Sequence, residues 1–346
     1  MKTIYKSLIV IGLIVFVAAS IIGFRLYKRI LKPNIFLHQA DSVIFHIPTG
    51  SDVEDVKTLL YSQGLLRDSS TFSWMSDKKN YPTHVYPGRY WLINEMNNRK
   101  LIDLLRSGAN VPLNLTFNNI RIREQLAGRI ANVLETDSLS MINLLSDSAF
   151  LAGYGFNEQT ITSMFIPNTY EFFWNTSAEE FFTRMYREYN SFWTPSRINK
   201  AEEVGLSKIE TSVLASIVEW ETIKNDEKPI VAGLYINRLK KGMKLQADPT
   251  VIFAHMNFSM RRVLTKHLKI DSPYNTYKYK GLPPGPIKIP AISSIDAVLN
   301  FQEHNYIFMC AKEDFSGYHN FASNLIQHGR NARKYRKALN ERKIYE

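Results

Sequence analysis

The stretch SKIETSVLASIVEWET, residues 207–222, predicts a mostly buried helix. Ser207 and Glu210 fit a capping box, the Ser-x-x-Glu pattern that opens a helix. The apolar side chains that follow cover well over half of the helical circumference. Such a helix has little surface left for water, so we expect it to lie in the core of an α+β domain.

Glu219 interrupts this apolar helix. At 100° per residue, the positions stacked on it are all small: Ser212, Ala215, Ser216 and Thr222. A carboxyl group among short side chains predicts the floor of a pocket, where burial would raise its pKa and suit it to general acid catalysis. The open alternatives are a buried Glu held by an Arg and an exposed Glu at a helix end. Glu221, about 200° further round the helix, is expected to be a surface or supporting group that cannot pair with Glu219.

Two segments downstream suggest a sugar-binding cleft. In LQADPTV, residues 245–251, Gln246 and Asp248 precede a proline, which predicts an extended segment rather than a helix. The segment SPYNTYKYKGLPPGPIKIP, residues 272–290, is rich in proline, glycine and tyrosine and predicts a long ordered loop. Tyrosine rings beside Asn and Thr suit a sugar, although tyrosines that only fill the core are an equal alternative.

Several other chemistries lack their usual signals. His319 and His328 lie nine residues apart with no further ligand at metal-binding spacing, so we predict no metal site. Nucleotide-binding glycine motifs and the GxSxG motif are absent from the sequence, and we predict no cofactor. The single cysteine, Cys310, permits no intramolecular disulfide.

The net charge of +11 is concentrated at the two ends of the chain. Residues 1–32 carry +6 and residues 330–346 carry +5, which leaves the body neutral. A nucleic-acid-binding face would need a basic stripe across the fold. The charge distribution therefore argues against a nucleic-acid partner.

Residues 7–24, SLIVIGLIVFVAASIIGF, contain no charged residue and approach the ~20 positions that a bilayer crossing needs. They predict a membrane helix within an anchor segment, residues 1–32. A cleaved signal peptide is the competing interpretation, but basic residues follow where a small-residue cleavage site is expected. The flanking charges do not decide the orientation.

The next segment, residues 42–110, predicts the order strand, helix, helix, strand. The strands are expected at 43–48 and 89–92, and the helices over a stretch opened by a Ser51/Glu54 capping box and at 71–79. This is the order of the LysM glycan-binding module, although a generic α+β unit is an equal alternative. Residues 111–206 are expected to form a connecting helical segment and residues 207–346 a mixed α+β catalytic domain.

The chain also resembles a known family. Five segments together are similar to the YceG-like family of endolytic murein transglycosylases: LASIVEWET (214–222), INRL (236–239), GMKLQADPTVIF (242–253), the loop at 272–290 and YHNFASNLIQH (318–328). PGRYWL (87–92) and FIPNTYEF (165–172) agree with it, whereas residues 117–119, 163–164 and 168 depart from the family pattern.

The resemblance implies a lyase that cleaves peptidoglycan strands between N-acetylmuramic acid and N-acetylglucosamine, leaves 1,6-anhydro ends and terminates nascent strand elongation. It implies that Glu219 is the catalytic residue and that five further residues contact the substrate: Gln246, Asp248, Tyr274, Asn275 and Tyr277. It further implies a single-pass protein of the bacterial inner membrane with a periplasmic catalytic domain and cell-wall synthases, the penicillin-binding proteins, as partners.

Two other functions remain open from the residues themselves. One is a glycan hydrolase with Glu219 as the acid and Asp248 as the second carboxylate. The other is a non-catalytic peptidoglycan-binding scaffold built around the LysM-like module.

Overall fold

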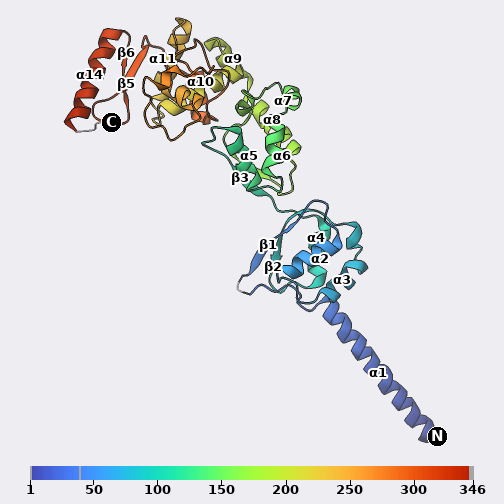
Figure 1. Ribbon diagram of the computed structural model, residues 1–346. Helices are drawn as coiled ribbons and strands as arrows, with labels where there is room; N and C mark the ends of the chain where they lie inside the picture. Colours follow the sequence, from blue (N-terminus) through green and yellow to red (C-terminus); the bar gives the residue numbers. More distant parts are fainter. Residues whose placement is uncertain (1, 39, 343–346) are drawn as a thin grey trace. The chain divides into compact units, whose positions relative to one another are not determined.

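The computed structural model describes residues 2–38 and 40–342 (Figure 1). The fold is mixed α+β, as predicted. The chain divides into two compact units. Unit 1 extends to Asn114 and adds Val133–Glu135 and Glu171–Thr176, whereas unit 2 holds Leu115–Asn132, Thr136–Tyr170 and the chain from Ser177 onward. Most of the residues assigned from the sequence to the connecting segment thus occur in unit 2, together with those of the predicted catalytic domain.

The first helix, α1 (Lys2–Ile30), contains the predicted membrane segment and is longer at both ends. Its large apolar side chains are exposed from Ile4 to Phe24, and its length and composition suit a membrane crossing. The end of α1 contacts the rest of unit 1. Arg29 lies over the ring of Trp74, and its carbonyl oxygen accepts a hydrogen bond from Asn98 Nδ2 at 2.9 Å.

Unit 1 confirms the predicted order of strand, helix, helix, strand. Its elements are β1 (Ser42–Ile47), α2 (Val53–Ser62), α3 (Ser69–Lys78), β2 (Gly88–Ile93) and α4 (Asn98–Ser107). A short 3-10 helix, Tyr81–Thr83, lies between α3 and β2. Strands β1 and β2 pair antiparallel with Ser42 opposite Ile93, and the three helices pack beside them (Figure 1). Buried side chains from all five elements form one apolar core.

The capping box predicted for α2 is wrong by one residue. Asp52 is the N-cap and accepts a hydrogen bond from Asp55 N at 2.9 Å, while the Asp55 carboxylate accepts one from Asp52 N at 3.0 Å. Aspartate serves as an N-cap as well as serine does. Two neighbouring acceptors therefore competed for this position, and the sequence pattern did not separate them.

Unit 2 is mainly helical. Its helices are α5 (Arg123–Ala131), α6 (Ser138–Leu144), α7 (Ser148–Gly153), α8 (Ala178–Phe192), α9 (Pro195–Val204), α10 (Lys208–Glu221), α11 (Lys228–Lys240), α12 (Asp248–Ala254), α13 (Ile292–Leu299) and α14 (Leu325–Glu341), with short 3-10 helices at Ile161–Met164 and His267–Lys269. Strand β5 (Phe308–Ala311) pairs with β6 (His319–Ala322) beside α14 (Figure 1). Strand β3 (Leu113–Thr116) pairs with β4 (Thr169–Phe172), and the residues of these two strands are divided between the units.

The central helix of unit 2 is α10, which packs against α11, α12 and α13. The predicted capping box at its start is confirmed: Ser207 Oγ accepts from Glu210 N at 3.2 Å, and the Glu210 carboxylate accepts from Ser207 N at 2.8 Å. Every residue from Thr211 to Val218 is buried. Beyond this buried stretch, the last turn of α10 is again partly accessible, and that turn carries both Glu219 and Glu221.

The prediction that Asp248 lies in an extended segment is wrong. Asp248 is the first residue of α12. A proline is tolerated in the first turn of a helix, where its missing N–H would have no partner in any case. The proline at 249 therefore marks the start of a helix here. The loop at 272–290 is confirmed as a segment without helix or strand.

Candidate active site

A polar cavity of about 240 Å³ lies in unit 2 around the carboxyl group of Glu221. We call it the Glu221 cavity. Helix α10 contributes Glu221 at its last position, and the other walls come from α11, the start of α12, the 272–290 loop and strands β5 and β6. Its polar side chains are Glu221, Tyr235, Arg238, Gln246, Asp248, Tyr277 and His319.

Glu221 is well suited to hold a proton. Burial raises the pKa of its carboxyl group to about 7, against a hydrogen bond from Tyr235 that lowers it. The negative charge of Asp248 adds to the rise, and His319 and Arg238 partly oppose it. The Tyr235 hydroxyl donates to Glu221 Oε1 at 2.6 Å, and burial raises the pKa of Tyr235 itself well above its usual value. Glu221 therefore keeps its proton to a higher pH than an ordinary glutamate does.

Three of the predicted substrate-contacting residues meet in this cavity: Gln246, Asp248 and Tyr277. The Tyr277 hydroxyl donates to Asp248 Oδ1 at 2.5 Å, and Gln246 Oε1 accepts from Arg238 Nη1 at 3.2 Å. Gln246 has a positive φ of 52°, and its N–H donates to Thr276 O at 3.1 Å. The 272–290 loop therefore fixes the backbone that delivers Gln246 and Asp248 to the cavity.

Glu219 lies elsewhere, in a cluster of cations. Its Oε2 accepts hydrogen bonds from Lys228 Nζ at 3.1 Å and from Ser294 Oγ, and Lys288 Nζ lies 3.7 Å from Oε1. The expected rise of its pKa is wrong. Burial raises the pKa of Glu219, but the hydrogen bonds and the two lysine charges lower it by more and leave it below its usual value. The environment is that of the alternative named above, a buried Glu held by a basic residue, with lysine in place of arginine.

The remaining two predicted substrate residues lie outside the Glu221 cavity. Asn275 is fully buried, and its Nδ2 donates to Leu268 O and Ile270 O at 2.9 Å each. Its Oδ1 accepts from Tyr277 N at 3.0 Å, so Asn275 braces the loop. Tyr274 lines a separate cavity, described below. The substrate role of each of these residues stays a prediction.

Residues that the sequence did not single out complete the cavity. Tyr235 and Arg238 lie three positions apart on α11, and Arg238 belongs to the INRL segment. The sequence pattern suggests no role for His319 beyond a metal ligand, yet His319 lines this cavity. Its Nδ1 lies 2.8 Å from Oε2 of the buried Glu227, which also accepts from His319 N at 2.7 Å. Among residues 2–38 and 40–342, no group of three or more His, Cys, Asp or Glu side chains could hold a metal ion.

With this geometry established, comparison with known proteins identifies the family. The YceG-like family profile matches residues 45–334, most of the chain. The chain belongs to the YceG-like family. The family resemblance inferred from the motifs is thereby confirmed.

Related proteins agree with this assignment. A Bacillus subtilis protein named endolytic murein transglycosylase is 30% identical over 337 residues, which cover 92% of each chain. A Streptococcus pneumoniae protein of the same name is 26% identical, and the match covers 94% of this YceG-like chain and 65% of that relative. The crystal structure of a putative yceG-like protein from Listeria monocytogenes superposes with a TM-score of 0.56 at 27% identity, covering 84% of this chain and 98% of that one.

Proposed function

We propose that this YceG-like protein is an endolytic lytic transglycosylase that cleaves peptidoglycan strands between N-acetylmuramic acid and N-acetylglucosamine. The family and the names of its relatives support the reaction class. The observation that carries the proposal is Glu221, a carboxyl group with a pKa raised to about 7 in a polar cavity. A proton donor of this kind is what glycosidic bond cleavage requires.

In the proposed reaction, protonated Glu221 donates its proton to the glycosidic oxygen as the bond from that oxygen to C1 of N-acetylmuramic acid breaks. The carboxylate then takes the proton of the C6 hydroxyl while O6 bonds to C1, which gives the 1,6-anhydro end. Tyr235 occupies Oε1 of Glu221, so Oε2 exchanges the proton. An internal hydroxyl as nucleophile supplies the proximity that water would lack.

The proposal places the catalytic role on Glu221 and not on Glu219, where the sequence predicted it. A general acid must be protonated near neutral pH, and the lysines around Glu219 favour its ionised form. Gln246, Asp248 and Tyr277 also surround Glu221. Glu219 instead compensates the charge of Lys228, whose side chain is only 6% exposed.

A matched pair of variants tests this proposal. Glu221→Gln should lower cleavage of purified peptidoglycan by about 10²–10⁴-fold without lowering the Tm, because the variant removes a carboxyl group that is costly to ionise in the fold. Glu219→Gln should lower the Tm and keep the activity of the folded fraction. If Glu219→Gln loses cleavage at an unchanged Tm while Glu221→Gln stays active, Glu219 is the catalytic residue and the proposal is wrong.

A hydrolase remains the second candidate because Asp248 lines the same cavity as Glu221, and hydrolysis needs two carboxylates flanking one bond. Mass analysis of fragments made in heavy-oxygen water separates the two reactions. A transglycosylase yields anhydro ends that are one water lighter and carry no label. Labelled reducing ends would show that water is the nucleophile and would make Asp248 the first candidate for the second carboxylate.

We also propose that β1, α2, α3 and β2 form a LysM-like glycan-binding module. Their order and the antiparallel pairing of the two strands support it. If a scaffold built on this module were the whole function, the wild type would bind peptidoglycan sacculi without releasing fragments. Release of fragments by the wild type, lost in Glu221→Gln with sacculus binding retained, supports an enzyme that carries a binding module.

The proposed location is the bacterial inner membrane, with α1 as the single anchor and the body in the periplasm. The exposed apolar surface of α1 supports the anchor. A membrane-held enzyme would meet nascent strands beside the cell-wall synthases, the proposed partners. Protease added outside the inner membrane should degrade the body, and protection of the body would reverse this topology.

A further inference from the structure

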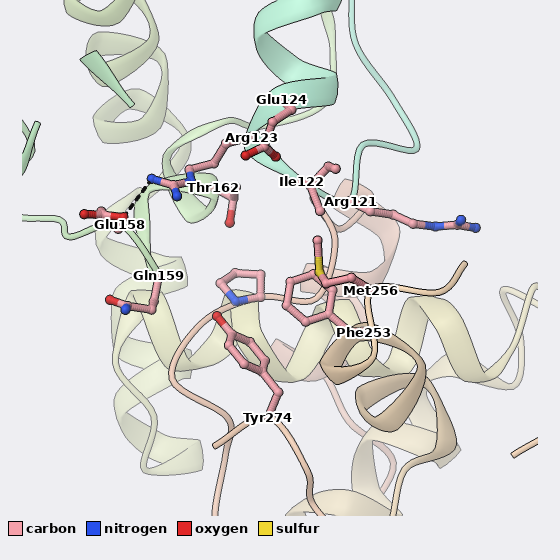
Figure 2. Close-up of a pocket in the computed structure, with 11 residues that line it drawn as sticks. Arg121, Ile122, Arg123, Glu124, Glu158, Gln159, Thr162, Phe253, Met256 and Tyr274 are labelled. Atoms are coloured by element: carbon pink, nitrogen blue, oxygen red, sulfur yellow. Dashed lines mark hydrogen bonds and ion pairs between the residues drawn. The ribbon is translucent and has the colours of Figure 1, made fainter. Parts of the chain in front are cut away.

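A second cavity in unit 2, of about 200 Å³, lies between α5, the 157–162 segment, the end of α12 and the 272–290 loop (Figure 2). We propose that it binds one further sugar ring of the glycan strand that is cleaved at Glu221, an inference that rests on the proposed function. We call it the Thr162 cavity, after the residue that carries the argument.

Thr162 supplies an unused hydrogen-bonding group. Its side chain is 6% exposed, and its Oγ1 is buried without a hydrogen-bond partner among the described residues. A buried hydroxyl without a partner destabilises the fold, and a ligand that bonds to it would offset that cost. Figure 2 shows Thr162 and the Tyr274 hydroxyl directed toward the same space.

The opposite wall is apolar. Phe253 and Tyr274 pack with ring centroids 4.7 Å apart, and Pro286 and Met256 extend this surface. The walls are held close to each other: a Cβ at Gly285 would lie only 1.9 Å from the carbonyl oxygen of Gln159. The Thr162 hydroxyl thus faces an aromatic wall that carries a second hydroxyl, that of Tyr274. A closely held cavity of this kind suits a sugar ring, which has apolar faces and hydroxyl edges.

The charges around the cavity favour an uncharged ligand. Arg123 is paired with Glu158 at 3.2 Å and donates to Leu145 O at 2.6 Å. Arg121 points away from the cavity in Figure 2, and its guanidinium lies 4.7 Å from the ring centroid of Trp220. Glu124 adds a carboxylate to the lining. Because Arg123 already has a carboxylate partner and Arg121 points away from the cavity, we assign the cavity to the sugar chain and not to a peptide stem.

The two cavities share their supports. Asp248 at the start of α12 lines the Glu221 cavity, and Phe253 near its end lines the Thr162 cavity. Five residues of helix separate them by roughly 7.5 Å along the axis. The loop contributes Tyr277 to the first cavity and Tyr274 to the second. One strand can therefore reach both.

The test compares glycan strands of two lengths, a tetrasaccharide and a dodecasaccharide of alternating N-acetylglucosamine and N-acetylmuramic acid, with the full chain in detergent. Thr162→Val removes the hydroxyl and keeps the shape of the side chain. We expect the ratio of kcat/KM for the long strand to that for the short strand to fall about two- to tenfold. The Tm should stay equal or rise, because the variant removes an unpartnered buried hydroxyl. Tyr274→Phe should lower the same ratio.

Ser163→Ala is the matched control. Ser163 Oγ is also buried without a partner among the described residues, in the same 3-10 helix, but Ser163 does not line the cavity. An unchanged ratio in Thr162→Val, or an equal fall in Ser163→Ala, overturns the inference. A wild type that cleaves neither strand instead overturns the proposed function, and the two failures are thus distinguishable.

Discussion

Two carboxyl groups at Glu219 and Glu221, on one turn of one helix, have pKa values moved in opposite directions by their neighbours. Glu219 meets two lysines and a serine hydroxyl, which favour its ionised form. Glu221 meets a buried environment and the like charge of Asp248, which favour its protonated form. Titratable groups pushed apart in this way mark acid and base assignments at an active site.

The pH dependence of cleavage should report Glu221. Because the acid must be protonated, kcat/KM should fall as pH rises through about 7. Asp248→Asn removes a charge that raises this pKa, so the falling limb should move to lower pH. Tyr235→Phe removes a hydrogen bond that lowers it, so the limb should move to higher pH. Shifts in the same direction, measured by rate profiles of the two variants, would contradict the assignment.

Glu219 should contribute to stability rather than chemistry. Its pKa is lower in the fold than in the unfolded chain, so its contribution is present above the unfolded pKa and is lost as pH falls through the folded pKa. Glu219→Gln leaves Lys228 buried without its counter-ion, a loss of about 3 kcal/mol. Thermal unfolding should show the largest gap from wild type at neutral pH and a narrowing gap in acid.

The matched control for this loss is Glu188→Gln. Glu188 pairs with Arg184 at 2.7 Å on the surface of α8, where such pairs contribute about 0–1 kcal/mol. An equal Tm loss in both variants would show that the ion pairs of Glu219 stabilise the fold no more than a surface ion pair does.

At the scale of elements, the 272–290 loop acts as a support for the start of α12. Asn275 ties the loop to the carbonyl groups at 268 and 270 and to Tyr277 N, and Tyr277 in turn donates to Asp248. Thr276 accepts at its carbonyl oxygen from Gln246 N and at its hydroxyl from Ala247 N. Removing the Asn275 hydrogen bonds should therefore disturb the side chains of the Glu221 cavity.

We expect Asn275→Ala to lower the free energy of unfolding by about 3 kcal/mol, because it leaves two carbonyl groups and one N–H without partners. Urea unfolding measures this loss, and kcat/KM should fall with it. Asn300→Ala, which removes an exposed side chain bonded to Asp296 O and Lys200, should change little. Weaker substrate binding at unchanged stability in Asn275→Ala would instead support the direct substrate contact that the sequence predicted.

At the scale of the whole molecule, α1 both supplies the apolar segment and completes unit 1. Asn98 is fully buried. Its Nδ2 donates a hydrogen bond to the Arg29 carbonyl oxygen, and its Oδ1 accepts one from Asn34 Nδ2 at 2.7 Å. Ile30 is partly buried against the core of unit 1. The end of α1 therefore belongs structurally to the folded body, although the sequence assigned it to the anchor.

Two truncated chains separate these roles. A chain that begins at Lys28 should remain in solution without detergent and keep its Tm, because it retains the Arg29 carbonyl and Ile30. A chain that begins at Pro33 should also be soluble but lose about 1–3 kcal/mol, because the Asn98 amide loses its buried acceptor. If either chain needs detergent, apolar surface outside α1 also meets the membrane.

Features that depend on local pattern could be predicted from the sequence alone. The capping box at Ser207, the buried stretch after it, the apolar helix near the amino terminus and the loop without regular structure were all predicted from neighbouring residues and confirmed. Ordered motifs along the chain also determined the family. These predictions hold because capping, periodicity and proline content act within a few residues.

Which of the two glutamates faces the polar cavity follows from the packing of the helices and not from the sequence pattern. A helical wheel gives the angle between Glu219 and Glu221, but not what lies opposite each of them. Lys228 and Ser294 lie 9 and 75 residues further along the chain and bond to Glu219 in the fold. A helical wheel of α10 carries no information about such residues. Tyr235 and Asp248 meet Glu221 only because α11 and α12 pack around α10. A pKa depends on surrounding charges and burial in three dimensions, so it was fixed when these helices packed together.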